Sequence, residues 1–535
     1  MKTILCQVFI PVLCAETLPA QSAPANRPER LEWFQDLGFG MFIHWSMDGQ
    51  LGVVISHSMA GAPDDYLKRY VEELPKTFCP EKFNPKAWAR LARVAGMKYV
   101  MFTAKHHSGF CMFDTATTDF NVMHTPFQRD VVAEVVDAFR EQGLAIGLYF
   151  SADDFYWLYR NGRTVDRRAE LMPPAQPELM EYAKAQLKEL LSNYGRIDLM
   201  FFDGHSAGLT DYVWNLVPEM VITSGGMRVT EQHIAGSVSA DPFEACFTMG
   251  QEWSYRPTNE AYKSGTQLIE MLIETRARGG VLLLNVGPTP EGEIPIEQEN
   301  RLREVALWTF INGVAIYGVR PWIVTNEGNC WFTKKKDANT VYVAVREPWQ
   351  FTERKTIRLA SVRATADTTV SVLGQSDELI EYRPQEDAKT TWTQEADGLV
   401  ISAVRAQRLY TRGVWPNPAV LKITNVEPAL TPPRVVTRDW KWDPATDTVT
   451  FDGELVDMAG ATSLDVWLEY RSLKGQDVNE RTLPWTATAP EPRTTTGVFA
   501  ASVKGLEAGE AYEFRAVVKH PLLALYGEDK KAVLK

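Results

Sequence analysis

Cysteine is scarce in this 535-residue sequence, and basic residues are not in excess. Two of the six cysteines fall within the first 25 residues; the others are widely spaced, without a C-x-x-C pattern, at Cys79, Cys111, Cys246 and Cys330. So few cysteines exclude a disulfide scaffold. We expect buried free thiols, with one or two bridges formed after export as the alternative. The 68 acidic residues outnumber the 56 basic ones, which gives a net charge of −12. This balance argues against non-specific binding to nucleic acid or to an anionic membrane.

Long apolar runs are missing as well. Beyond the N-terminal segment, no stretch reaches the roughly 18 apolar residues of a membrane-spanning helix, so we expect no membrane span. The segment itself has Lys2, an apolar stretch from Ile4 to Cys14, and small residues as far as Ala25. This pattern predicts a signal peptide over residues 1–25 and export to the periplasm or the extracellular space, although a merely hydrophobic terminus would look similar.

A repeating pattern of short apolar runs and amphipathic stretches occupies residues 35 to 320. The chain is too long for a single core, which stops growing at roughly 250–300 residues. The runs that resemble strands are Phe39–His44, Lys98–Thr103, Ala145–Phe150, Ile197–Phe202, Met220–Thr223 and Val281–Asn285. Strands that alternate with helices predict a parallel sheet with crossover helices. We therefore predict an α/β fold, a (β/α)8-type TIM-like barrel over residues 26–322; a doubly wound open sheet is the alternative.

The remainder of the chain reads as two all-β units. Short apolar runs separated by turn residues predict a β-sandwich over residues 323–427. A proline-rich linker, Pro428 to Pro433, follows it. Residues 434–535 again contain short strands and resemble a fibronectin type III or immunoglobulin-like module.

Two carboxylates attract attention within the barrel region. Asp203 ends the run IDLMFFDG, so it emerges from a buried strand into a turn. A buried carboxylate needs either a partner or a task, although a turn or helix-capping role is equally open for this residue alone. Glu244 lies among apolar and aromatic residues, which would raise its pKa and suit a general acid. An ionised and a protonated carboxyl group together are what glycoside hydrolysis requires.

Histidines and aromatic residues also gather at the expected strand ends, where barrel active sites lie. The histidines are His44, His106 and His107, and the aromatic residues that could stack on a sugar ring are Trp45, Tyr149, Trp253 and Tyr255. Neutral imidazoles would hydrogen-bond to sugar hydroxyls, whereas the same histidines with Asp203 could instead bind a metal. Adjacent residues of a strand point to opposite faces, so one of His106 and His107 could equally be a core residue.

Several motifs together resemble the α-L-fucosidases of glycoside hydrolase family 29. They are FGMFIHW, YVMFTAKHHSGF, the Arg-Asp step at 129–130, GLYFS, FFDG, LLLNVGPTPEGEIP and NGVAIYGVRPW. They occur in the family's order and span residues 33 to 322, the whole predicted barrel. The resemblance implies a retaining enzyme that needs no cofactor or metal and removes terminal α-L-fucose from a fucosylated oligosaccharide or polysaccharide.

The resemblance also implies roles for particular residues. Asp203 matches the family's nucleophile, and Glu244 is the first choice for the acid/base, with Glu252 the second. The implied substrate-binding residues are His44, Trp45, His106, His107, Tyr149 (or Phe150), Arg228 and Trp253.

Two departures from the family pattern fall where the sugar pocket would lie. His205 replaces a tryptophan, and residues 51–67 read LGVVISHSMAGAPDDYL. A related L-sugar such as α-L-galactose therefore stays open as the substrate. Two further alternatives are a metal-dependent hydrolase, which the histidines would allow, and a non-catalytic fucose-binding protein.

Overall fold

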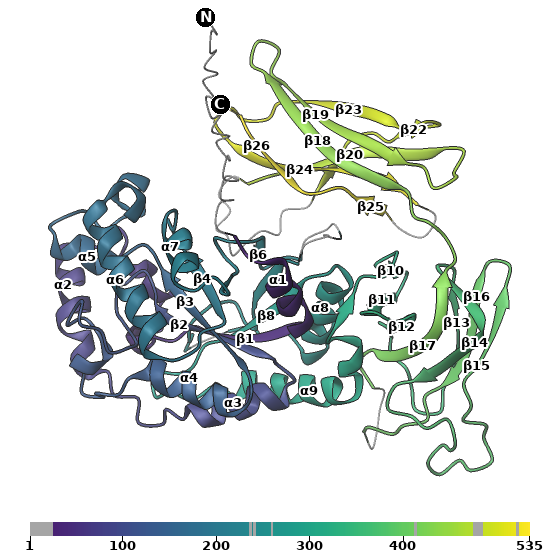
Figure 1. The fold of residues 1–535 in the computed structure, drawn as a ribbon, viewed down its shortest axis with the longest axis horizontal. Coiled ribbons are helices and arrows are strands. Elements are labelled where there is room, and N and C mark those ends of the chain that lie inside the picture. Colours follow the sequence, from purple (N-terminus) through teal and green to yellow (C-terminus); the bar gives the residue numbers. More distant parts are fainter. Residues whose placement is uncertain are drawn as a thin grey trace, which may run out of the picture.

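The computed structural model describes residues 25–234, 238, 242–257, 260–410, 415–473, 485–520 and 524–534. Figure 1 shows three successive units: a helix-covered sheet, a β-sandwich and a C-terminal module of strands. The predicted signal peptide falls almost entirely outside the described residues. Within them, no helix is both long enough and apolar enough to cross a bilayer.

The first unit contains a sheet of eight parallel strands in the order β5-β4-β3-β2-β1-β8-β7-β6. Their bounds are β1 Phe39–Ile43, β2 Tyr99–Lys105, β3 Ala145–Ser151, β4 Leu199–Asp203, β5 Val221–Ile222, β6 Val229–Glu231, β7 Glu244–Thr248 and β8 Val281–Val286. The first strand pairs with the eighth, so the sheet curls into a barrel. Within the described residues, β5 and β6 do not pair, which leaves an open seam between these two very short strands.

Helices cover the outside of this barrel. They are α1 Pro28–Leu37, α2 Asp64–Glu72, α3 Pro85–Val94, α4 Val131–Glu141, α5 Phe155–Arg160, α6 Pro177–Asn193, α7 Leu209–Leu216, α8 Gly265–Ala277 and α9 Ile296–Asn312. Asp130 caps α4 by accepting a hydrogen bond from the Ala133 amide at 2.9 Å. In the described chain, β5 and β6 follow each other without a helix, in contrast to the predicted regular alternation.

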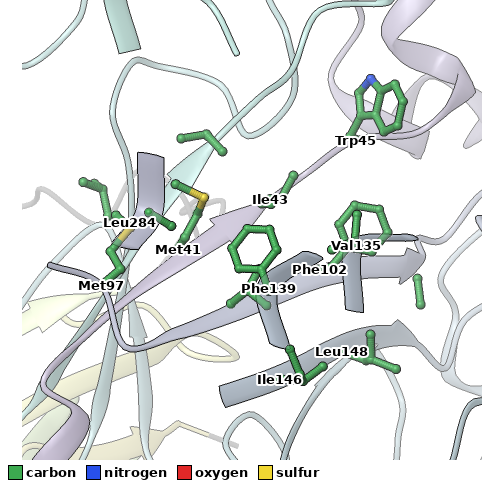
Figure 2. Close-up of a cluster of buried hydrophobic side chains, with 14 of the residues drawn as sticks. Met41, Ile43, Trp45, Met97, Phe102, Val135, Phe139, Ile146, Leu148 and Leu284 are labelled. Atoms are coloured by element: carbon green, nitrogen blue, oxygen red, sulfur yellow. The ribbon is translucent and has the colours of Figure 1, made fainter. Parts of the chain in front are cut away.

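Alternation of side chains along the strands divides the core into two layers. Phe42 and Tyr149 point into the barrel, whereas Met41 and Ile43 point outward to the helices. Figure 2 shows this outer layer, in which Phe139 of α4 lies among strand residues such as Phe102, Ile146 and Leu148. Because both faces are buried, the strands read as continuous apolar runs, which is why six of the eight could be predicted.

The second unit is a β-sandwich of two antiparallel sheets. One sheet contains β9 Val319–Arg320, β10 Asn326–Glu327, β11 Cys330–Lys335, β12 Thr340–Val345, β14 Val362–Val372 and β17 Ala419–Pro428. The other contains β13 Arg354–Leu359, β15 Thr391–Glu395 and β16 Gly398–Val404. The sandwich packs on the barrel: the Trp308 indole of α9 donates a hydrogen bond to the Pro418 carbonyl at 2.7 Å.

The C-terminal module follows residues 429–433. One sheet contains β18 Arg434–Asp443, β19 Thr448–Asp457 and β23 Gly497–Lys504. The other contains β20 Leu464–Ser472, β21 Thr486–Ala487, β22 Glu491–Arg493, β24 Ala511–Lys519, β25 Ala524–Tyr526 and β26 Lys530–Val533. The module has a core of its own, with Phe451 and Phe514 at its centre.

The predicted fold class is confirmed, since a (β/α) barrel is followed by a β-sandwich and a further β-domain. The thiols match their prediction only in part. All four described cysteines are free, but only Cys111 and Cys246 are buried, and Cys79 is exposed.

Candidate active site

Asp203 is the last residue of β4 and lies at the carboxyl end of the barrel strands. The Tyr149 hydroxyl donates a hydrogen bond to its Oδ2 at 2.5 Å, and His107 Nε2 lies 3.4 Å from the same oxygen. Gly204 follows with a φ of +77°, and a β-carbon there would lie 2.5 Å from the Asp153 carboxyl carbon. Only glycine therefore fits this turn. The Asp203 side chain is 34% exposed, so it is both anchored and accessible.

Three histidines surround this carboxylate. His44 follows β1, and His106 and His107 follow β2, all of them buried. The His106 ring lies parallel to the Tyr149 ring, 5.3 Å between centroids. Burial lowers the pKa of His44 to about 4 and holds the pKa values of His106 and His107 well below their usual range. These imidazoles are thus neutral near pH 7 and suit hydrogen bonding to uncharged hydroxyl groups.

Neighbouring polar groups fix the orientation of these rings. The Nδ1 atoms of His106 and His107 lie 2.5 Å from the hydroxyls of Ser56 and Ser151, respectively. His44 Nδ1 lies 2.7 Å from Asn285 Oδ1, and the Asn285 amide donates to the Trp253 carbonyl at 2.6 Å. Trp253 packs on His44, with 5.0 Å between ring centroids. The structure therefore brings together six of the residues named from the sequence, namely His44, His106, His107, Tyr149, Trp253 and Asp203.

Three further side chains, Arg167, Asp153 and His205, lie beside Asp203, and none of them was among the predicted site residues. Arg167, from the segment between α5 and α6, has its Nη2 atom 3.7 Å from Asp203 Oδ1 and donates from Nε to Asp153 at 3.1 Å. Asp153 is fully buried and also accepts a hydrogen bond from the His205 amide at 2.9 Å. Asp153 thus holds Arg167 and His205 beside the carboxylate of Asp203. Asp153 could be found as a residue at a strand end, but nothing in its long loop distinguishes Arg167.

Glu244 does not belong to this site, which corrects its assignment as the acid/base. It is the first residue of β7 and lies beside Val281, the first residue of β8, at the opposite end of the barrel. Its side chain is fully buried and accepts a hydrogen bond from the Tyr99 hydroxyl at 2.7 Å. Burial raises its pKa to about 7, as expected, but the raised value reflects the barrel interior. No strand was predicted at Glu244–Thr248, so the direction of the Glu244 side chain could not be foreseen.

Trp45 and Arg228 also lie away from Asp203. Strand alternation turns Trp45 outward, where its ring stacks on Phe83 at 5.2 Å in the outer core. Arg228 lies between β5 and β6, immediately before β6, and its guanidinium binds Asp529 of the C-terminal module at 3.0 Å. The cation beside the candidate nucleophile is Arg167 instead.

Two other glutamates lie at the catalytic side of the barrel. Glu231 ends β6 and is half-buried. Burial is the largest cause of the raised pKa of Tyr149, followed by Asp203, and the charge of Glu231 adds a smaller contribution. Glu252 follows β7 next to Trp253, but its carboxylate lies 3.8 Å from Arg256, and both side chains are about one-third exposed.

The site also offers a possible set of metal ligands. Single ligand atoms of His106, His107 and Asp203 lie within 4.8 Å of one another. Two imidazoles and a carboxylate are donors that zinc accepts. The Nδ1 atoms of both histidines contact serine hydroxyls, so their Nε2 atoms would be the ligands.

The barrel and its carboxylate, set among neutral hydrogen-bonding side chains, define a glycoside hydrolase. The chain belongs to the α-L-fucosidase family, glycoside hydrolase family 29, because the family model described as alpha-L-fucosidase matches residues 15–314. This membership favours the fucosidase prediction over the L-galactosidase and non-catalytic alternatives.

Similar proteins agree with this assignment. The tissue α-L-fucosidase of Mus musculus is 29% identical over 69% of this chain and 87% of its own length. The α-L-fucosidase isoenzyme 1 of Paenibacillus thiaminolyticus is 27% identical, with a TM-score of 0.59 over 75% of this chain and 99% of that one. The Thermotoga maritima α-fucosidase, solved in complex with fucose, is 25% identical, with a TM-score of 0.58 over 74% of this chain and 96% of that one.

Proposed function

We propose that the protein is an exported, retaining exo-α-L-fucosidase in which Asp203 is the nucleophile and Glu231 the acid/base. The observation that carries this proposal is the environment of Asp203, a strand-end carboxylate held by Tyr149 and lined by neutral histidines. A fucosylated oligosaccharide or polysaccharide is the substrate. Export rests on the N-terminal pattern of Lys2, an apolar stretch and small residues.

The reaction follows a double displacement. Asp203 attacks the anomeric carbon while Glu231 gives its proton to the glycosidic oxygen, so the leaving sugar departs as an alcohol. Glu231 then removes a proton from water, which attacks the fucosyl-enzyme and releases fucose with retained configuration. Arg167 and the Tyr149 hydroxyl orient the Asp203 carboxylate, and the neutral histidines bind the sugar hydroxyls.

Glu231 is preferred to Glu252 on two grounds. Its charge acts on Tyr149, the direct partner of the nucleophile. It also ends its strand and pairs with Cys246 of β7, a residue of the inner core, so its side chain points into the barrel. Glu252, in contrast, lies four residues beyond the end of β7, 3.8 Å from Arg256.

The nucleophile is tested with Asp203→Ala. We expect hydrolysis of an aryl α-L-fucoside to fall by at least about 10⁴-fold, because the covalent intermediate cannot form. Added azide should restore turnover and yield a β-L-fucosyl azide, identified by NMR, because azide then attacks the substrate directly. Near-wild-type activity of this variant would exclude Asp203 as the nucleophile.

The acid/base is tested by comparing Glu231→Ala, Glu252→Ala and Glu244→Gln. Glu231→Ala should cut kcat/KM for a fucosyl disaccharide by about 10²–10⁴-fold, yet spare an aryl fucoside whose leaving group needs no protonation. Azide should give the α-L-fucosyl azide with this variant alone. If Glu252→Ala behaves in this way and Glu231→Ala does not, Glu252 is the acid/base.

A metal-dependent hydrolase is the second candidate, because His106, His107 and Asp203 could share a cation. The double-displacement proposal assigns Asp203 to the sugar, so a strong chelator should leave kcat/KM unchanged. Loss of activity with a chelator, reversed by added Zn²⁺, would favour the metal reading instead.

A further inference from the structure

The strand that carries Glu231 has little support from the barrel itself. Strand β6 contains three residues and hydrogen-bonds to β7, and in the described chain it does not pair with β5. A strand this short, with one paired edge, is the part of a sheet most easily displaced. A carboxyl group that must lie within hydrogen-bond reach of a glycosidic oxygen nevertheless requires a fixed backbone.

The C-terminal module binds the chain immediately before this strand. Arg228 precedes β6, and its Nη2 atom lies 3.0 Å from Asp529 Oδ2. The Asp529 side chain is only 2% exposed, and its other oxygen lies 3.7 Å from Arg515 of the same module. Such a buried carboxylate depends on its cationic partners, so removing Arg228 leaves it poorly compensated.

A cavity separates the module from the chain that follows β6. Val238, in the segment between Glu231 and β7, lines this cavity of about 460 Å³ together with Pro433, which precedes the module, and Leu525 and Tyr526 of the module. Figure 1 shows β6 on the side of the barrel that faces the module. The module therefore contacts the chain just before β6 and lies across a cavity from the chain that follows it.

We propose that the C-terminal module positions Glu231 for catalysis through the ion pair between Arg228 and Asp529. This inference rests on the proposed role of Glu231. Side chains alternate along a strand, so Arg228 points outward to the module while Glu231 points to the barrel interior. The ion pair fixes the position of β6 along the barrel axis and its rotation about its own axis. It thereby fixes the direction of the Glu231 carboxyl group. Arg228 and Asp529 are thus positioning residues and do not touch the substrate.

The test is the dependence of activity on the leaving group in full-length Arg228→Gln, Asp529→Asn and the double variant. We expect each single variant to lose about tenfold or more in kcat/KM for a fucosyl disaccharide, which needs the acid. Activity towards an activated aryl fucoside should stay within about twofold of wild type. The double variant should have the same kcat/KM for the disaccharide as the less active single variant, because both changes remove the same interaction.

Control variants separate positioning from stability. Arg438 and Glu454 form an exposed ion pair in the same module, so Arg438→Gln should leave both activities unchanged. Arg228→Lys keeps the positive charge and should recover most of the disaccharide activity. Equal losses on both substrates, or no loss on either, would overturn the proposal.

The failure of this inference can be distinguished from failure of the proposed function. If the wild-type enzyme hydrolyses neither fucoside, the function itself is wrong. If Glu231→Ala shows no dependence on the leaving group, the acid assignment is wrong. If both of those results are as proposed and the Arg228 variants show no such dependence, only the role of the module is wrong.

Discussion

Asp203 and Glu244 are both carboxylates beside apolar strand residues, and the barrel gives them opposite surroundings. Asp203 ends its strand, is 34% exposed, and faces Tyr149, His107 and Arg167. Glu244 begins its strand and is fully buried against the Tyr99 hydroxyl. Solvent access and donor groups, which a strand's direction determines, thus separate a catalytic carboxylate from a structural one.

Glu244→Gln should retain activity within about threefold of wild type, because the amide oxygen can still accept the Tyr99 hydrogen bond. The pH dependence of stability should change. The folded-state pKa of Glu244, about 7, exceeds the ordinary value of 4.5, so its contribution is fully present below pH 4.5 and is lost as the pH rises through 7.

The glutamine variant lacks this loss. Its free energy of unfolding, relative to wild type, should therefore rise by on the order of 3 kcal/mol between pH 4.5 and pH 8. Urea denaturation of both proteins at several pH values measures the difference. If the free energies of unfolding of the two proteins changed with pH in the same way, the titration assigned to Glu244 would be wrong. If Glu244→Gln lost more than about 10²-fold in activity, a catalytic role for Glu244 would have to be reconsidered.

Individual site residues could be predicted where they directly follow a long apolar run. His44, His106 and Asp203 satisfy this condition because a strand's end is then recognisable, and Tyr149 lies two residues before the end of β3. Arg167 lies in a polar loop, and its contact with Asp203 depends on the path of that loop through space. Trp45 was misassigned because a one-residue change along a strand turns a side chain to the other face.

The strands on either side of the seam are the weakest elements of the barrel. Strand β5 has two residues and β6 three, whereas β1 and β8 each pair with a neighbour on both sides. Fewer backbone hydrogen bonds allow local opening at a lower free energy. In hydrogen-exchange mass spectrometry, we expect peptides covering β5 and β6 to exchange at least about tenfold faster than those covering β1 and β8. Equal protection of all four strands would show that the seam is as stable as the rest.

Strands β6 and β7 were missed in the sequence for a related reason. Three residues, Val229–Glu231, are too few to show a periodic pattern, and the five residues of β7 merge with the aromatic residues that follow them. Boundaries of long elements such as α9, in contrast, follow from amphipathic spacing and the glycine after it. Local pattern therefore predicts the regular part of the barrel and fails where tertiary contacts hold a short strand.

We expect the described chain to unfold as two cooperative bodies. The barrel core extends to Tyr342, Trp415 and Val420 of the sandwich, which couples the two units, and the sandwich adds a core cluster that includes Phe332 and Leu421. The module has a separate core. We expect calorimetry to resolve two transitions, one for barrel and sandwich together and one for the module.

Asp529→Asn should shift the module's transition by a few degrees or less while leaving two transitions, because the module's own core stays intact. A single transition in the wild type would show that the bodies unfold together. The pattern of apolar runs predicted three units, but it could not show that the barrel core extends into the sandwich, because that depends on contacts between residues over 100 positions apart, such as Trp308 and Pro418.

The open seam has a consequence for the behaviour of the protein in concentrated solution. Unpaired strand edges present backbone donors and acceptors that a second chain can bind, which is a common route to aggregation. Here the two edges are only two and three residues long, and the C-terminal module lies over the side of the barrel that carries β6. The module thus limits the access of a second chain to these strand edges. We expect chains in which the module detaches from the barrel to associate first on storage or heating.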